Sequence, residues 1–367
     1  MKTAYINARV YTGYEQLSEM AILDNDGIIE DLCPISAIPE GYELEDMQGL
    51  NMAPALIDLQ IYGGNGSLFL NDLSVESLKA TYEYCLSGGA AFFMITIPSA
   101  PIDTFLKGMD IVREYQSAGG KGLLGLHMEG PYMNPAKRGA HGTHLLKTAS
   151  LKEVEMLLER GKDVLKMITL APELCDPEII RYLIENNIIV SAGHSNAGYP
   201  EAMAGFELGI PTSTHLFNAM SPFLSREPGL VGAILDHPGA MASVICDGVH
   251  VDFSSLRICK QIMKDRMFYI TDAVAAAETG EYPHVFKGDR YTMPDGTLSG
   301  SALTMMKSVQ LGMQHLRISL EESLRMASTY PARLLRSYRK LGHIAKGYES
   351  GFIVFDDDLN LKGLKGI

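Results

Sequence analysis

The sequence predicts an α/β protein: a (β/α)8 barrel of the TIM type, joined to a small β-sandwich domain built from both ends of the chain. Three observations support this prediction. The middle of the 367-residue chain contains eight short apolar runs, stretches with helical periodicity separate these runs, and both chain ends instead alternate apolar and polar residues. Apolar strands that alternate with helices are typical of a parallel sheet, and eight such units close a barrel.

The first fifty residues predict a small antiparallel β unit with one face in solvent. The segments AYINARVYT (4–12) and EMAILDNDGIIEDLC (19–33) alternate in polarity, and turn signals such as Asp26-Gly27 interrupt them. The C-terminal stretch GYESGFIVFDDDLNLKGLKGI has the same character and is expected to supply the remaining strands. We therefore expect residues 1–51 and 336–367 to form the small domain and residues 52–335 to form the barrel domain.

The expected barrel strands follow one another along the chain. They are residues 52–62, 90–100, 122–129, 166–173, 188–195, 212–218, 241–248 and 267–273. Two of the intervening stretches, LKEVEMLLERG (151–161) and PEIIRYLIENN (177–187), have the apolar spacing of an amphipathic helix. A doubly wound open sheet is the rival architecture, but no GxGxxG turn follows the first strand, so the dinucleotide-binding form has no support.

Composition excludes several classes of protein. The formal net charge of −13 argues against binding to nucleic acid or an acidic membrane surface, because such binding needs a basic face. There is no apolar signal core near the N-terminus and no apolar run of about 18 residues that predicts a membrane span. The five cysteines are an odd number without a CxxC pair, which indicates a reducing compartment. A cytoplasmic protein is expected.

Four polar residues stand at or near the ends of the expected strands. Glu129 ends the third run, His194 ends the fifth, His215 lies close to the end of the sixth, and Asp272 ends the eighth. The C-terminal ends of all strands of a barrel lie at one face, where active sites are assembled from different strands. These four side chains are therefore expected to share one pocket.

One glutamate and two histidines are a common ligand set for a catalytic divalent metal. Glu129, His194 and His215 would hold the ion and leave a position open for water. The metal lowers the pKa of that water, and the carboxylate of Asp272 can accept its proton and return it to a leaving group. Nitrogen and oxygen ligands suit Zn²⁺, but Fe²⁺, Co²⁺ or Mn²⁺ could occupy the same set.

Each of these residues also has a simpler structural interpretation. Taken alone, a histidine after glycine, such as His194, is more often a hydrogen-bonded structural residue than a ligand, and Asp272 could cap a following helix. His127 shares a strand face with Glu129 and is an alternative ligand, although we expect it only to support the site. The coincidence of four such residues at four strand ends favours the metal site.

Two further residues predict an anion site. Arg226 in SREPG and His250 in DGVHVD would be ordinary surface residues if taken alone, but both follow strands on the expected active face. A guanidinium group is the preferred protein partner of a phosphate. Lys137 and Arg138 are expected on a solvated loop. The remaining histidines are expected to be structural or at the surface: His144, His237, His284, His315 and His343.

Six motifs, in this order, resemble the amidohydrolase superfamily, and in particular its members that deacetylate amino sugar phosphates. They are HMEGPYMNPAKRGAH, SAGHSNA, THLFNAMSP, ICDGVH, ITDA and LSGSALTM. The likeness extends from about Ala53 to the C-terminus, and the combination is specific although each motif alone is weak. A small sheet built from both chain ends also fits this family. The resemblance implies hydrolysis of the N-acetyl group of N-acetylglucosamine 6-phosphate to glucosamine 6-phosphate and acetate, with one divalent metal ion per chain.

The resemblance also implies roles for individual residues. Glu129, His194 and His215 would hold the metal, Asp272 would act as the general acid and base, and His141 would contact the acetamido carbonyl or the sugar.

A second group would bind the rest of the substrate. The backbone at Asn218 and Ala219, together with Arg226 and His250, would bind the 6-phosphate, and His250 would reach in from the second subunit of a homodimer. The segment that includes Leu298 would line the sugar pocket.

One departure from the superfamily pattern concerns the first strand. Many amidohydrolases carry His-x-His there, but this chain has Gln60 and Tyr62, which are poor metal ligands. A single metal is therefore expected, and the tyrosine would reshape the pocket floor. This leaves open another N-acyl substrate, such as N-acetylgalactosamine 6-phosphate or an N-acyl amino acid. A non-catalytic scaffold with the same fold is the remaining alternative.

Overall fold

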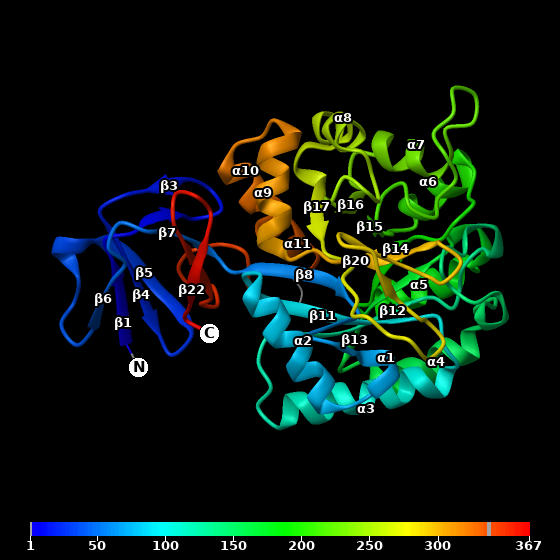
Figure 1. Ribbon diagram of the computed structural model, residues 1–367, viewed down its shortest axis with the longest axis horizontal. Coiled ribbons are helices and arrows are strands. Elements are labelled where there is room, and N and C mark those ends of the chain that lie inside the picture. Colours follow the sequence, from blue (N-terminus) through cyan, green and yellow to red (C-terminus); the bar gives the residue numbers. More distant parts are fainter. Residues whose placement is uncertain (1, 336–338) are drawn as a thin grey trace.

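The structure, a computed structural model, describes residues 2–335 and 339–367. A barrel surrounded by helices forms the larger part, and a small two-sheet unit lies at one side of it and carries both ends of the chain (Figure 1). The predicted fold class is confirmed. Residues 336–338, at which the predicted C-terminal part of the small domain begins, lie outside the described residues.

Eight parallel strands form the barrel sheet, and they are hydrogen-bonded in chain order. They are β8 (Leu56–Ile61), β11 (Ala90–Pro98), β12 (Leu123–Glu129), β13 (Leu165–Leu170), β14 (Ile189–Ala192), β15 (Thr212–Ser213), β16 (Met241–Ile245) and β17 (Met267–Ile270). Every residue of β8, β11 and β12 is buried, as expected for parallel strands covered on both faces. All eight predicted strands are present.

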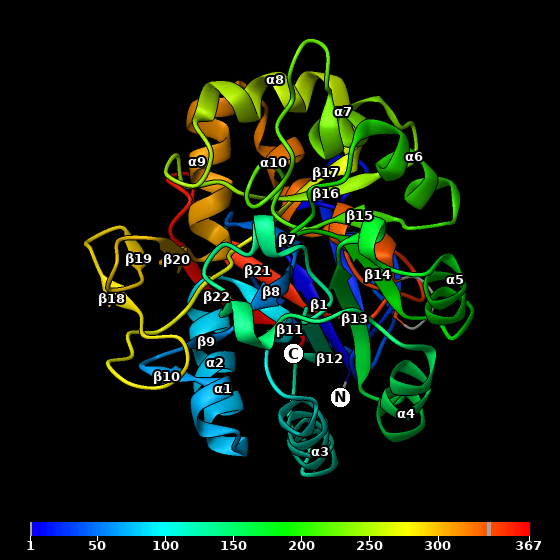
Figure 2. The same ribbon diagram turned by 90° about the vertical axis from the view of Figure 1, so that its right-hand side faces the viewer.

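Helices pack around the outside of this sheet (Figure 2). They are α1 (Phe69–Asp72), α2 (Val75–Ser87), α3 (Ile102–Ser117), α4 (Leu151–Gly161), α5 (Pro177–Glu185), α6 (Tyr199–Glu207), α7 (Gly229–Asp236), α8 (Phe253–Met263), α9 (Met305–Leu316), α10 (Leu320–Ala327) and α11 (Thr329–Ala332). Short polar side chains begin several of them: Ser74 accepts a hydrogen bond from Ser77 N at the start of α2, and Asp176 accepts one from Glu178 N at the start of α5. Within the described residues, none of these helices combines the length and hydropathy that crossing a membrane requires.

The small unit consists of two sheets with a shared apolar core. One sheet has the order β5-β4-β1-β6 and the other β22-β21-β7-β2-β3. The strands are β1 (Lys2–Ile6), β2 (Arg9–Tyr11), β3 (Gln16–Leu17), β4 (Met20–Asn25), β5 (Ile28–Pro34), β6 (Glu43–Asp46), β7 (Asn51–Pro54), β21 (Phe352–Phe355) and β22 (Leu361–Lys365). Met52 lies opposite Val354, so the C-terminal strands complete the second sheet as expected.

The first and last barrel strands meet near their C-terminal ends. Asp272 N donates to Gln60 O at 3.0 Å, and Tyr62 N donates to Ala273 O at 2.9 Å. Deeper in the barrel, the buried carboxylate of Asp58 accepts hydrogen bonds from the backbone N–H and the hydroxyl of Thr271. A side chain therefore supplements the backbone at this seam and fixes the strand end that carries Asp272.

Beyond β17 the chain forms a three-stranded sheet that the sequence did not predict. It consists of β18 (Val285–Phe286), β19 (Arg290–Thr292) and β20 (Leu298–Ser301). Ser301 N donates to Asp272 O at 2.9 Å, so this sheet is attached directly to the end of β17. It thereby forms one wall of the opening at the C-terminal ends of the barrel strands.

Candidate active site

The four predicted strand-end residues lie together at the C-terminal end of the barrel. Glu129 is the last residue of β12, and His194, His215 and Asp272 each follow a strand by two residues. These last three have positive φ angles of 47°, 36° and 54°, a region that residues other than glycine rarely occupy. The backbone leaves the extended conformation at these positions, and the side chains turn into the barrel mouth.

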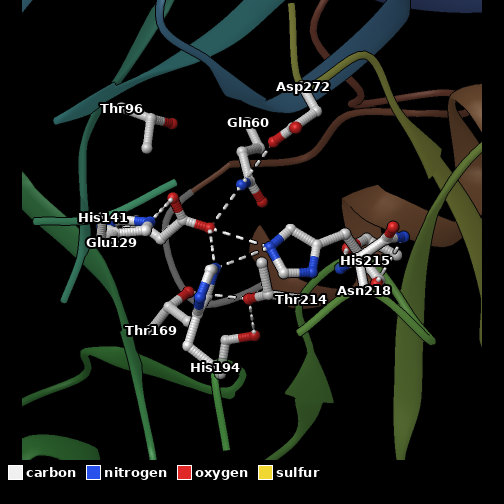
Figure 3. Close-up of polar contacts among 12 residues, drawn as sticks. Gln60, Thr96, Glu129, His141, Thr169, His194, Thr214, His215, Asn218 and Asp272 are labelled. Carbon is white, nitrogen blue, oxygen red and sulfur yellow. Dashed lines mark hydrogen bonds and ion pairs between the residues drawn. The ribbon is translucent and has the colours of Figure 1, made fainter. Parts of the chain in front are cut away.

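The carboxylate of Glu129 is the centre of the site (Figure 3). Its Oε1 atom lies 3.4 Å from His194 Nε2 and 3.1 Å from His215 Nε2, and the two Nε2 atoms are 3.1 Å apart. All three side chains are buried. The Oε2 atom faces a different set of groups: His141 Nε2 at 3.3 Å and the hydroxyl of Tyr62.

Hydrogen bonds to the other ring nitrogens indicate which histidines can bind a metal. His194 Nδ1 lies 3.0 Å from the carbonyl oxygen of Lys137, so this nitrogen carries the proton and Nε2 presents a lone pair toward Glu129. In His141 the order is reversed, because Nδ1 accepts a hydrogen bond from Ser99 N at 3.2 Å and the proton of the neutral ring is therefore on Nε2.

Two overlapping groups therefore fit a divalent ion to different degrees. Ligand atoms of Glu129, His141 and His194 all lie within 4.8 Å of one another. His141, however, directs an N–H toward Glu129, which suits a hydrogen-bond donor rather than a ligand. The set Glu129, His194 and His215 offers one oxygen and two nitrogens from three strand ends, and this donor chemistry fits Zn²⁺ or a similar ion.

Burial and mutual contact shift the pKa values of the group. Burial opposes a charge on Glu129, but hydrogen bonds from His141 and the other two histidines hold its pKa well below the usual range. Burial lowers the pKa of His194 to about 4. Burial also opposes a charge on His215, but its hydrogen bond to Glu129 and the charge of that carboxylate raise its pKa. A neutral His194 is the form that a metal requires.

Asp272 is connected to this cluster through Gln60. The side-chain amide Nε2 of Gln60 lies 2.8 Å from Asp272 Oδ1 and 2.9 Å from Glu129 Oε1. Burial raises the pKa of Asp272 to about 6, and the charge of His215 partly opposes the shift. A carboxyl group with a pKa near neutrality is suited to accept and return a proton.

His127 lies beneath the site rather than in it. Its Nε2 atom is 2.7 Å from the hydroxyl of Thr169 and its Nδ1 atom is 3.4 Å from that of Thr96, and the Thr169 hydroxyl in turn lies 2.7 Å from that of Thr214. Burial lowers the pKa of His127 to about 4, so the ring is neutral. These contacts support the strand ends that carry Glu129 and the residues around it, and the contact between Thr169 and Thr214 is drawn in Figure 3.

A cavity of about 260 Å³ opens above the cluster. Nine of the ten predicted site residues line it: Glu129, His141, His194, His215, Asn218, Ala219, His250, Asp272 and Leu298. Two residues that were not predicted for the site, Tyr282 and His284, also line the cavity. Tyr282 donates from its hydroxyl to Ser99 O at 2.7 Å, and its ring lies edge-on to that of His141 at 5.8 Å. No spacing in the sequence signals these two residues, because they come from the irregular segment before β18.

Arg226 is the predicted residue that the structure places elsewhere. It is exposed on the loop before α7 and lines a separate hollow with residues near the start of α6, not the cavity that contains Glu129. In addition, the backbone N–H of Asn218 donates to His215 O at 2.9 Å, so a turn already uses this donor. Within one chain, His250 and the backbone of Ala219 are thus the predicted phosphate contacts that remain in the cavity.

His250 is held in place by a neighbouring carboxylate. Asp247 Oδ2 lies 2.6 Å from His250 Nδ1, and Asp247 Oδ1 accepts hydrogen bonds from the backbone N–H groups of Val249 and His250 at 2.8 and 2.9 Å. The proton of Nδ1 is therefore directed at Asp247, and Nε2 is left for a ligand. His250 lines the cavity of its own chain, although the family resemblance implied that it would enter from a second subunit.

Comparison with known proteins gives consistent matches. Residues 51–365 match the model of the amidohydrolase family, and residues 4–52 match that of the NagA composite domain. N-acetylglucosamine-6-phosphate deacetylase of Haemophilus influenzae is 36% identical over 374 residues, which covers 99% of this chain and 97% of that protein.

Two further relatives bear on fold and substrate. The crystal structure of N-acetylglucosamine-6-phosphate deacetylase from Pasteurella multocida has a TM-score of 0.93 and 34% identity, and covers 98% of this chain and 97% of that one. N-acetylgalactosamine-6-phosphate deacetylase of a Shewanella species is 31% identical over 316 residues, which covers 84% of this chain and 79% of that protein.

Proposed function

Because the chain belongs to the amidohydrolase family, we propose that it hydrolyses the N-acetyl group of N-acetylglucosamine 6-phosphate to give glucosamine 6-phosphate and acetate. It is an enzyme, a hydrolase that acts on a carbon–nitrogen bond. Proteins named for this activity are similar to the present chain over nearly its whole length. The cavity of about 260 Å³ has room for a small polar ligand of this kind.

One observation carries the chemical part of the proposal. Glu129 Oε1 and the Nε2 atoms of His194 and His215 lie between 3.1 and 3.4 Å from one another at the mouth of the barrel. Three ligand atoms at such distances, two of them histidine nitrogens, would repel one another electrostatically or share protons unless a cation joins them. We propose that they hold one divalent metal ion per chain, with zinc as the resident metal.

Each residue around the proposed ion has a separate task. When bound, a divalent ion supplies an activated water for attack on the acetamido carbonyl. Asp272 accepts the proton of that water at its carboxylate and returns it to the departing amine nitrogen. His141, whose Nε2 carries a proton, donates a hydrogen bond to the carbonyl oxygen as negative charge develops there.

The phosphate end of the substrate would be bound by His250. Asp247 orients this ring through its contact with Nδ1, which leaves Nε2 to face the phosphate. Arg226 does not line this cavity, so we propose that it acts on the substrate of a second chain in a homodimer. A cytoplasmic location is also proposed, and the free state of all five cysteines supports a reducing compartment.

The first experiment measures acetate release from N-acetylglucosamine 6-phosphate together with metal content by mass spectrometry. We expect turnover with about one metal per chain. Asp272→Asn should retain the metal but lose about 10²–10⁴-fold in kcat, whereas Asp103→Asn, an exposed change in the first turn of α3, should leave kcat unchanged. A metal-loaded Asp272→Asn enzyme with normal turnover would refute the assignment of the general base.

A second substrate has specific support. Deacetylases of N-acetylgalactosamine 6-phosphate from a Shewanella species and from Escherichia coli are 31% and 29% identical to this chain. Comparing kcat/KM for the two epimers decides between them, and a preference for the galactose epimer would replace the proposed substrate without changing the reaction. A protein that binds neither zinc nor either sugar would instead be a non-catalytic scaffold. The presence of Glu129, His194, His215 and Asp272 together argues against this alternative.

A further inference from the structure

We propose that Tyr62 is a positioning residue that divides the two oxygens of Glu129 between the metal and the protein. Its hydroxyl holds Oε2, so that only Oε1 is presented to the ion. This inference rests on the proposed metal-dependent function and adds the reason why Glu129 binds through one oxygen. Tyr62 occupies a strand position where many amidohydrolases have a ligand, but here it acts on a ligand instead of being one.

The contacts of the two oxygens are clearly different. Oε1 faces the Nε2 atoms of His194 and His215 at 3.4 and 3.1 Å. Oε2 accepts a hydrogen bond from the hydroxyl of Tyr62 and lies 3.3 Å from His141 Nε2. Oε2 thus has only proton donors around it, whereas Oε1 lies next to the two nitrogen ligands, with Gln60 Nε2 at 2.9 Å as its one additional donor.

Tyr62 is better suited than His141 to hold Oε2 throughout the reaction. In the proposed reaction His141 turns its Nε2–H to the carbonyl oxygen of the substrate, so its contact with Glu129 is lost. The Tyr62 hydroxyl also accepts a hydrogen bond from Gln60 Nε2 at 2.9 Å, and the same nitrogen lies 2.8 Å from Asp272 Oδ1. Tyr62 and Gln60 therefore connect the ligand Glu129 to the proposed general base, independently of the substrate.

The phenol ring is fixed firmly enough to act in this way. Tyr62 N donates to Ala273 O at 2.9 Å, and Tyr62 O accepts from Phe69 N at 3.0 Å. The ring packs against a small apolar cluster that contains Leu68 and Val274. A hydroxyl on such a fixed ring can select one rotamer of the carboxylate, because hydrogen-bond partners of metal ligands set the orientation of those ligands.

The alternative is that Tyr62 only fills the floor of the barrel mouth. Tyr62→Phe separates the two roles, since phenylalanine keeps the ring and its packing and removes only the hydroxyl. Tyr330→Phe is a matched control: the Tyr330 hydroxyl also donates to a glutamate, Glu322, at 2.8 and 2.9 Å, but on α11, outside the barrel mouth. Both variants lose one tyrosine–glutamate hydrogen bond.

The test measures metal binding without relying on activity. Metal-free wild type and both variants are titrated with Zn²⁺ against a competing chelator, and the Co²⁺-loaded forms are compared by visible absorption. We expect Tyr62→Phe to bind Zn²⁺ about 10–100-fold more weakly and to show an altered Co²⁺ spectrum, because Glu129 can then approach the ion with both oxygens. Tyr330→Phe should match the wild type in both measurements.

The outcomes separate this inference from the function on which it rests. A Tyr62→Phe protein with wild-type Zn²⁺ affinity and an unchanged Co²⁺ spectrum overturns the role of Tyr62 and leaves the deacetylase proposal intact. A wild type that binds no metal overturns both. If Tyr62→Phe does not fold, the crystal structure of the zinc-loaded wild type decides: one Glu129 oxygen on the metal and the other on Tyr62 supports the inference, and two oxygens on the metal refute it.

Discussion

Three residues of the site have a backbone conformation that is unusual for residues other than glycine. His194, His215 and Asp272 all have φ angles between 36° and 54°, where a Cβ atom is crowded by the backbone. Neighbouring hydrogen bonds hold these conformations, for example Asp272 N to Gln60 O at 3.0 Å. The strained positions are the ones that turn polar side chains away from the barrel wall and toward a common centre.

The pKa of Asp272 leads to a prediction about pH. Burial raises this pKa to about 6, and the proposed reaction uses the ionised carboxylate to accept a proton. Since a lower pH protonates the group, kcat/KM should fall as the pH is lowered through about 6, in proportion to the ionised fraction. Initial rates of acetate release on both sides of this pH test the prediction. A flat profile down to pH values at which an ordinary aspartate is still ionised would exclude Asp272 as the group that titrates.

The sequence predicted the kinds of residues in the site better than their hydrogen bonds. Glu129, His194 and His215 could be chosen because each lies at or near the end of a predicted strand, and strand ends meet in a barrel. The donor role of His141 depends on its contact with Ser99 N, a residue that follows a different strand. Arg226 was predicted to bind the phosphate from its guanidinium group, its position after a strand and the family resemblance, but its loop lies beside another hollow.

At the scale of elements, the seam between β8 and β17 depends on a buried acid. Burial raises the pKa of Asp58 to about 7, although hydrogen bonds from Thr271 oppose the shift. The folded chain therefore holds a proton on Asp58 that the unfolded chain releases near pH 3.8. Stability from this group is present below that value and is lost as the pH rises toward 7.

Asp58→Asn should remove this dependence. As the pH is raised from below 4 to above 7, the wild type should lose the contribution of Asp58 to its unfolding free energy, and the variant should not. The difference in unfolding free energy between variant and wild type should therefore shift in favour of the variant by up to roughly 4 kcal/mol. Thermal unfolding over this range measures the difference, and the exposed change Asp103→Asn should show none. A constant difference between Asp58→Asn and wild type at all pH values would mean that Asp58 is ionised in the folded protein.

The start of α2 provides a second prediction for an element. Ser74 Oγ accepts a hydrogen bond from Ser77 N at 3.1 Å, which satisfies one of the free N–H groups of the first turn. Ser74→Ala should reduce the unfolding free energy by about 1 kcal/mol, whereas Ser74→Asp keeps an acceptor and should stay near the wild type. Equal stability of the alanine and aspartate variants in chemical denaturation would contradict the capping role.

Strands were easier to predict than the joints between them. Each barrel strand overlaps one of the eight predicted runs, although β15 is only Thr212–Ser213. The run at 52–62, however, contains both the end of β7, in the small unit, and β8, in the barrel. The chain passes from one sheet to the other at Ala55, which is buried like its neighbours, so no change of polarity marks the transition. The sheet of β18 to β20 was missed for a related reason, because its short strands are partly exposed and have no regular alternation.

At the scale of the whole molecule, the proposed metal joins strand ends that are distant in sequence. Its three ligands lie at or just after the ends of β12, β14 and β15, so a bound ion adds a link across the barrel that the unfolded chain lacks. Removing the metal should therefore lower the melting temperature. The loss corresponds to about 4 kcal/mol at a free metal concentration roughly 1,000 times Kd.

Differential scanning calorimetry with and without a chelator measures this effect. His215→Ala serves as the comparison, since a protein that has lost one ligand should respond to the chelator much less than the wild type does. An equal decrease in both proteins would mean that the chelator acts through another site, and the set Glu129, His194 and His215 would then not be the ligands.

The pairing of β7 with β21 has a consequence for biosynthesis. Met52 and Val354 lie opposite each other in one sheet, and the entire barrel lies between them in the chain. A ribosome therefore delivers β1 to β7 long before it delivers their last partners. The edge of β7 that pairs with β21 therefore has no partner strand while about three hundred further residues are synthesised. Synthesis of the small unit thus begins before that of the barrel and ends after it, which gives chaperones a long opportunity to bind its early strands.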